Sequence, residues 1–260
     1  MIVFLRQMKA LVRLSFLELR RRNDVVGFLI LALALMVPLS MARPFGAVGA
    51  SRYLDEIALL LIWGFSLFIS LGTGSRLFPP EFESRTVLPL FSKPVSLGRL
   101  VFGKFLGAVT ASGCAVLAFY ALFALSVSLR GGDWASPVLV QAIVLHLGFV
   151  ALAVALSLLG SLVLTPSASL TLNALVLVVT FFFGRALPDY ADGAPAAVGW
   201  IARVAYAIAP HAEFFDMRQR VIHGWGAVEP GVLLAVLGYA SANVILLLAL
   251  AGLVLRRRKL

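Results

Sequence analysis

The stretch Val138–Gly184 contains no Asp, Glu, Lys or Arg over 47 residues. A helix needs about 20 mostly apolar residues to cross the hydrocarbon of a bilayer, where the backbone finds no hydrogen-bond partner outside the helix. The run therefore predicts two membrane-spanning helices, 138–160 and 166–184, which are separated at the turn Thr165–Ser169.

Four further apolar segments have a length that suits a membrane span. They are Val25–Ala42, Ile57–Ser75, Phe105–Leu129 and Val232–Leu255. Only 13% of the chain is charged, whereas a soluble domain needs about 25% to cover its surface, so a soluble catalytic domain is excluded. We expect an all-α polytopic membrane protein with six transmembrane helices in a single transmembrane domain, residues 1–260.

The distribution of basic residues predicts the orientation. If both termini share one side of the membrane, that side carries 15 of the 22 Lys and Arg residues. Cytoplasmic loops collect Lys and Arg, so we expect both termini on the cytoplasmic side of a bacterial-type inner membrane. The net charge of +10 then faces anionic lipid, and no nucleic-acid partner is expected.

The segment 1–24, before the first span, has an amphipathic pattern. Its cations share one side of a helical wheel: Arg6, Lys9, Arg13 and Arg20. We predict an interfacial elbow helix; the alternative is a basic tail that only sets the orientation. Residues 40–42 resemble a signal-peptide cleavage site, but the preceding apolar stretch of about 18 residues exceeds the usual length and favours a retained helix.

The loop 76–104, between the second and third spans, contains a short segment bounded by prolines. Pro79 and Pro80 end the span, and proline suits the first turn of a new helix. A helix beginning near Glu81 would carry Glu81 and Glu83 at its positive end, and Pro89 would stop it. Such a helix suits a socket on another protein; the alternative is a plain solvated loop.

Three motifs in and after this loop carry a family resemblance. They are Glu81–Thr86 (EFESRT), Ser92–Ser96 (SKPVS) and Gly103–Gly107 (GKFLG). With the six spans, the elbow helix and a long external segment before the sixth span, they resemble the permeases of type-2 ABC exporters. The external residues Tyr206–Pro210 and Glu213–Asp216 are similar to the family's pattern as well. Arg85 departs from it, since many relatives have glycine there.

The resemblance implies a permease that is driven by other subunits. The chain has no G-x-x-x-x-G-K-[ST] phosphate loop, so it is not expected to be an enzyme or to hold a cofactor. The partners implied are two cytoplasmic ABC ATPase subunits, which bind ATP and Mg²⁺, a second permease copy in a homodimer or a related permease, and membrane lipids. The residues implied to contact the ATPase are Glu81, Phe82, Glu83, Arg85 and Thr86.

A row of small residues begins the third span. Gly103, Gly107 and Ala111 follow a small-xxx-small spacing, which allows two helices to approach closely in lipid. The spacing fits packing within one subunit and packing across a dimer equally well.

The centres of the spans contain no Asp, Glu, Lys or Arg. Ion-coupled carriers normally place such residues there, so an external energy source is favoured. His146 and Asn173 are the polar residues that could line a pathway. His146 lies about 12 Å inside its span, and hydrogen bonding between helices is favoured over contact with cargo.

The external segment 185–230 is too long for a structureless connection. We expect 195–209 to lie at the outer membrane face, and His211–His223 to form one further helix with an Asp216–Arg220 pair, ended by Gly224. A metal site there is disfavoured because the two histidines need not share a face.

No catalytic or metal-binding residue is assigned. H-E-x-x-H and G-x-S-x-G are absent from the sequence, and the single Cys114, expected to be buried and inert, excludes a disulfide framework. The functional prediction is therefore the permease subunit of an ATP-driven exporter. A membrane scaffold that docks other proteins without moving cargo is the alternative. The cargo stays open.

Overall fold

The computed structural model describes residues 50–83, 97–132, 134–184 and 186–257, together with eight separate positions between 27 and 38. The predicted elbow helix 1–24 and most of the predicted first span lie outside the described residues. All regular structure in the described ranges is helical.

Five of the described helices are long and apolar enough to cross a membrane. They are α3 (Ala50–Ser75), α6 (Leu97–Leu129), α7 (Pro137–Ser161), α8 (Pro166–Phe183) and α12 (Pro230–Arg257). The predicted all-α polytopic fold is confirmed. Helices α3 and α6 begin before the predicted spans because a helix continues through polar residues that lie beyond the hydrocarbon.

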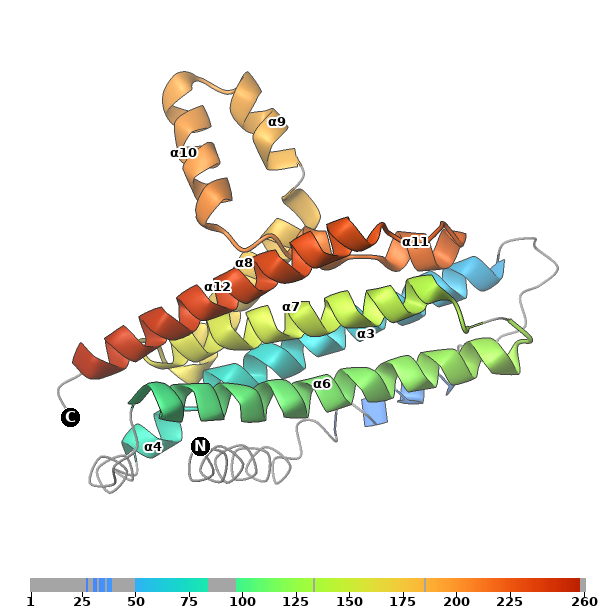
Figure 1. Ribbon diagram of the computed structural model, residues 1–260, viewed down its shortest axis with the longest axis horizontal. Helices are drawn as coiled ribbons and strands as arrows, with labels where there is room; N and C mark the ends of the chain where they lie inside the picture. The colour runs from blue at the N-terminus through green and yellow to red at the C-terminus, as the bar shows by residue number, and fades with distance from the viewer. Residues whose placement is uncertain are drawn as a thin grey trace.

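The bundle has two ends, which differ in what connects the long helices. The short helix α4 (Pro79–Glu83) lies between α3 and α6 at one end, where α12 also finishes (Figure 1). At the other end, α11 (Arg218–His223) lies beside the first residues of α3. We call these the α4 end and the α11 end.

The break between α7 and α8 lies at the predicted turn, at Thr165 and Pro166. Pro166 occupies the first turn of α8, where the missing N–H costs nothing, and the Thr165 side chain accepts a hydrogen bond from the Ala168 N–H. The start of α7 repeats this arrangement with Pro137 and the Ser136 side chain, which accepts from the Leu139 N–H. Each helix therefore has a defined start in a run without charges.

Helix α7 lies at the centre of the described bundle. It packs against α3, α6, α8 and α12, and consecutive residues Leu152–Ala155 are fully buried, so no side of the helix faces outward there. By contrast, α12 buries only Ala240, Ala251 and Leu255.

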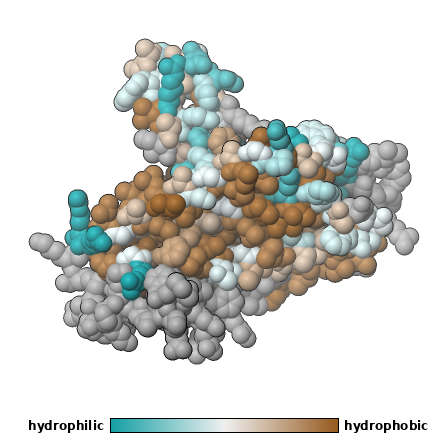
Figure 2. Space-filling view, in the orientation of Figure 1, coloured by the Kyte–Doolittle hydropathy of each residue, from teal (hydrophilic) through white to brown (hydrophobic). Residues whose placement is uncertain are grey.

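The outer surface of the long helices is broadly hydrophobic (Figure 2). Hydrophilic residues gather instead on the α9–α10 pair and near α11. Cys114 is exposed on α6, so the expectation that it is buried was wrong. In a membrane-spanning helix, residues that face lipid are apolar as well as residues that face the interior, so the apolar neighbours of Cys114 do not indicate burial.

Small residues bring α7 close to its neighbours towards the α4 end. A Cβ at Gly74 would lie 2.7 Å from the Ser157 Cβ, so only glycine allows α3 to approach α7 this closely. The Ser157 Oγ donates to the Leu71 carbonyl at 2.7 Å across the same contact. On the other side of α7, a Cβ at Gly160 would collide with the Ser169 side chain of α8.

Between α8 and α12, the chain forms a helical pair and two short helices. Helices α9 (Ala186–Gly193) and α10 (Ala196–Ile208) pack against each other and project away from the bundle (Figure 1). Gly199 permits their contact, because a Cβ there would lie 2.5 Å from the Ala191 carbonyl oxygen. Trp200 on α10 is exposed.

The predicted single helix His211–His223 is wrong in its middle. The chain forms a 3₁₀ helix, η1 (Ala212–Phe215), and then α11, with Asp216 extended between them. The Asp216 carboxylate accepts hydrogen bonds from the Arg218 backbone N–H and guanidinium, so the pair is Asp216–Arg218 and not Asp216–Arg220. This local bonding competes with a continuous helix. Gly224 ends α11 as predicted, at φ 62°.

Candidate functional site

The α4 end contains a buried lysine that fastens the start of α6 to the turn before α4. Lys104 is 4% exposed, and its Nζ donates to the Leu77 carbonyl at 2.7 Å. The same Nζ lies 5.1 Å from the centre of the Phe78 ring, which in turn stacks on Phe82 of α4. We call Lys104, Leu77 and Phe78 the lysine clamp. It couples α4 to α3 and α6 together.

Three of the five residues implied to contact an ATPase belong to α4. Glu81, Phe82 and Glu83 form its last turn, with Phe82 half-buried against the core. The side chains of Glu81 and Glu83 lie outside the description, as do the whole of Arg85 and Thr86. The helix begins at Pro79, two residues before the predicted start, since the prolines themselves form its first turn.

The small-residue row lies on the inner side of α6. Gly103, Gly107 and Ala111 are all buried. Gly113, two residues further on, faces α7, where a Cβ would meet the Leu147 side chain at 3.4 Å.

His146 is fully buried and bridges three helices. The Ser66 Oγ–H donates to the Trp63 carbonyl, so the His146 Nε2–H must donate to the Ser66 Oγ at 2.6 Å. The His146 Nδ1 then accepts from the Tyr120 O–H at 2.9 Å, which satisfies both ring nitrogens of a neutral histidine. This cluster of Ser66, Trp63, Tyr120 and His146, called here the histidine node, joins α3, α6 and α7.

Asn173 lies in the contact between α8 and α7. Its Nδ2 donates to the Ser169 Oγ at 3.2 Å, and Ser169 donates to the Ser157 carbonyl of α7. Neither Asn173 nor His146 is among the residues that line the two cavities described next.

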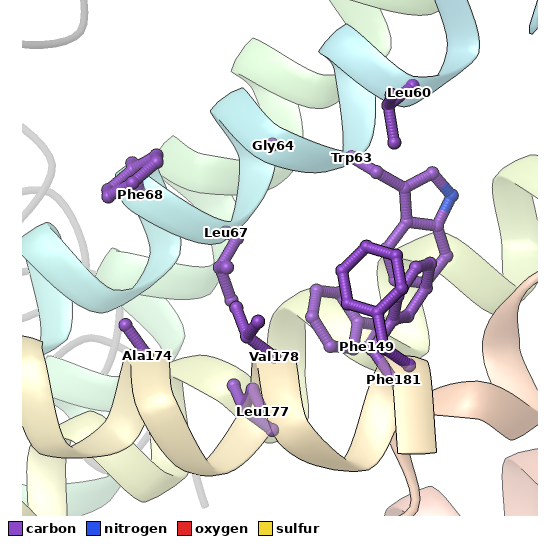
Figure 3. Close-up of a pocket in the computed structure, with 11 residues that line it drawn as sticks. Leu60, Trp63, Gly64, Leu67, Phe68, Phe149, Ala174, Leu177, Val178 and Phe181 are labelled. Atoms are coloured by element: carbon purple, nitrogen blue, oxygen red, sulfur yellow. The ribbon is translucent and has the colours of Figure 1, made fainter. Parts of the chain in front are cut away.

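An apolar slot of about 250 Å³ lies between α3 and α8 (Figure 3). It is lined by Leu60, Trp63, Gly64, Leu67, Phe68, Phe149, Ala174, Leu177, Val178, Phe181 and Phe182. Trp63 presents one face to the slot, and its ring stacks on His146 at a centroid distance of 4.4 Å. Phe68 and Val178 are exposed at the rim, so the slot opens on the surface of the bundle.

A larger cavity of about 630 Å³, the vestibule, lies at the α11 end. Its apolar walls come from α7, α8 and α12, and its charged residues are Glu213, Asp216, Arg218 and Arg220. The Arg218 guanidinium is bonded to Asp216 and lies 5.0 Å from the centre of the Phe181 ring. The vestibule is thus amphipathic.

In the wall of the vestibule, a second pair that includes Glu213 joins η1 to the bundle. Glu213 is 3% exposed and accepts from the His211 Nδ1–H at 3.2 Å, while the His211 backbone N–H donates to the Tyr239 hydroxyl of α12. A Cβ at Gly184 would collide with the Glu213 carboxylate, so glycine is needed at the end of α8. No group of three His, Cys, Asp or Glu side chains that could hold a metal is found in the described ranges.

Sequence reasoning missed the lysine clamp and the slot. It predicted that His146 forms hydrogen bonds between helices, but not that Ser66 and Tyr120 are the partners. Lys104 belongs to the GKFLG motif, but its burial depends on the turn of a segment 27 residues earlier. Trp63 and Gly64 line the slot only because α8 packs opposite them. Periodicity within one helix carries no signal for either contact.

Comparison with known proteins gives one family. The family model described as "ABC-2 family transporter protein" matches residues 61–254, which extends from the middle of α3 into α12. None of the curated proteins compared with the chain matches it.

Proposed function

Because the chain belongs to the ABC-2 family of transporter proteins, we propose that it is the permease subunit of an ATP-driven exporter that works as a dimer with two ATPase subunits. Family membership makes it a membrane component of an ABC transporter, with ATPases as partners. ATP and Mg²⁺ bind to those partners. The observation that carries the proposal is the family match over 61–254.

We propose that the ATPase pushes on α4. Only three residues, 76–78, separate α4 from α3, and the lysine clamp ties that turn to α6. A displacement of α4 therefore moves two long helices and is not absorbed by a loop. The contact residues in this proposal are Glu81, Phe82, Glu83, Arg85 and Thr86, one set in each permease copy.

The orientation follows from charge. In the described ranges, the α4 end carries Arg76, Arg99, Arg256 and Arg257, and cytoplasmic segments collect such residues. We therefore propose that the α4 end and both termini face the cytoplasm of an inner membrane. The α11 end, with the vestibule, then faces outward.

A second copy would complete the pathway. The outward faces of α8 and α12 are exposed and apolar, so lipid or another subunit must cover them. The burial of Gly103, Gly107 and Ala111 on the inner side of α6 supports packing of this row within the subunit. In a Cys114→Ser background, a Gly107→Cys variant that forms a disulfide-linked dimer in membranes would contradict this and place the row between subunits.

Affinity purification of the full-length chain from its own membranes tests the coupling. We expect mass spectrometry to identify a retained ABC ATPase and the complex to hydrolyse ATP. The double variant Glu81→Lys/Glu83→Lys should lose the ATPase, because it reverses charge at the docking helix. The control Glu229→Lys, which reverses an exposed charge at the α11 end, should retain it.

Three outcomes would overturn this proposal. Retained proteins without an ATPase would favour the scaffold. Chemical turnover by the purified chain alone would indicate an enzyme. Labelling that places the α4 end outside the cell would contradict the orientation.

A further inference from the structure

The slot and the vestibule are adjacent cavities that share part of their walls. Phe181 and Phe182, at the end of α8, line both cavities. The slot follows α3 and α8 through the membrane-spanning region, and the vestibule begins where α8 ends. An apolar chamber at membrane depth therefore meets a charged chamber at the α11 end.

The slot suits an alkyl chain. All eleven residues that line it are apolar or Gly, and none offers a charge to a ligand. Its volume of about 250 Å³ is below the range of about 300–1,000 Å³ for whole-ligand pockets, so the slot holds one part of a larger molecule. The exposed rim lets such a chain enter sideways from the bilayer.

The vestibule suits an anionic head group. Asp216 and Arg218 are bonded to each other, and Glu213 is bonded to His211 through Oε1, while Glu213 Oε2 is buried without a hydrogen-bond partner in the described part of the chain. The Arg220 guanidinium makes one hydrogen bond within the described part of the chain, from Nη1 to the Gly226 carbonyl, which leaves further N–H donors. A guanidinium pairs best with a phosphate or a carboxylate.

We propose that the slot and vestibule bind an anionic amphiphile, with its alkyl chain between α3 and α8 and its phosphate or carboxylate at Arg220. As a statement about cargo, this inference rests on the proposed export function. As a statement about binding, it needs no ATPase. Because the vestibule lies at the α11 end, the head group would be at that end and the molecule would come from the leaflet there.

Photo-crosslinking to the full chain in phosphatidylcholine nanodiscs tests the binding. The probes are three alkyl chains with a diazirine at the tail and a phosphate, a carboxylate or a trimethylammonium head. We expect the anionic probes to label peptides of α3 and α8, and the cationic probe to label them about tenfold less, because it loses the charge-assisted hydrogen bonds. The phosphate and carboxylate arms identify which anion is preferred.

Two matched pairs of variants locate the site. Gly64 lines the slot, and a Cβ there meets no atom within 4 Å, so Gly64→Leu should fill the slot without disturbing the helices. Gly238→Leu on α12, where a Cβ is equally free, is the control. Arg220→Gln should reduce labelling by the anionic probes about tenfold. Arg203→Gln, on the projecting α10, should not.

Equal labelling by all three heads, or labelling unchanged in both Gly64→Leu and Arg220→Gln, would overturn the inference. If Gly64→Leu fails to fold, the labelling of Arg220→Gln decides the outcome. Failure of the proposed function is a separate result. It would appear as head-selective labelling by a chain that retains no ATPase, whereas an ATPase-coupled complex without labelling would refute only the amphiphile site.

Discussion

The two ends of the bundle are built differently. At the α4 end, glycines bring α7 against α3 and α8, and the buried Lys104 joins α6 to the turn before α4. Towards the α11 end, α3 and α8 line the slot, the vestibule lies where α8 ends, and ion pairs form between Arg130 and Asp55 and between Arg218 and Asp216. Close contacts transmit displacement, whereas open space admits a ligand. The comparison thus separates the end at which we propose that force enters from the region in which we propose that cargo binds.

The largest effect on stability is expected at the close contact of Gly74 with α7. Gly74→Ala should lower the free energy of unfolding by about 3 kcal/mol, because the new Cβ would lie 2.7 Å from Ser157 and force α3 from α7. Denaturation of the full chain in mixed micelles measures the effect. Gly72→Ala, whose nearest atom would be 3.9 Å away, is the control on the same helix and should cost nothing. Equal effects at the two positions would show that the α4 end is not tightly packed.

The second test removes the lysine clamp. Lys104→Met should lower the free energy of unfolding by about 2 kcal/mol, since it leaves the Leu77 carbonyl without this donor in a buried place. It should also lower ATP hydrolysis that depends on the permease, even where the ATPase is still retained. Arg256→Met, at the exposed end of α12, is the control. Full coupling in Lys104→Met would show that the clamp is not part of force transmission.

The order and approximate bounds of the long helices could be predicted from the sequence, because apolar runs and helix-ending residues are local signals. The charge-free run and its Thr165–Pro166 break indicate α7 and α8, and Gly224 marks the end of α11 by its conformation. The sequence predicted an Asp216–Arg220 pair, and the observed pair is Asp216–Arg218. The i,i+4 spacing assumes a continuous helix, but the Asp216 side chain bonds to the Arg218 backbone N–H and interrupts the helix.

Only part of the candidate site could be predicted from the sequence. The position of α4 follows from its prolines, a local signal. The burial of Lys104 and the stacking of Trp63 on His146 depend on which helices become neighbours. A single sequence carries no information on such pairing.

The third test concerns the histidine node, which forms the wall behind the slot. His146→Phe should lower the free energy of unfolding by about 1 kcal/mol, as it keeps a ring against Trp63 but leaves the Tyr120 hydroxyl without its acceptor. A double-mutant cycle with Tyr120→Phe measures the coupling between the two side chains. Additive effects would show that the node does not join α6 to α7. If His146→Phe lowers stability but leaves amphiphile labelling unchanged, the histidine node is not needed for binding in the slot.

The smallest effects are expected from ion pairs beyond the α4 end. Arg130 pairs with Asp55 between α6 and α3, with side chains that are 16% and 24% exposed, so Arg130→Gln should cost about 1 kcal/mol. Arg203 pairs with Asp192 on the projecting helices, at 64% and 72% exposed, and Arg203→Gln should cost less than about 0.3 kcal/mol because water competes for both charges. Denaturation at low and high salt measures both, and only the Arg130 pair should still contribute at high salt. A larger cost for Arg203 would mean that α9 and α10 are held by a surface outside the described bundle, and the α11 end would then be less open than its two cavities indicate.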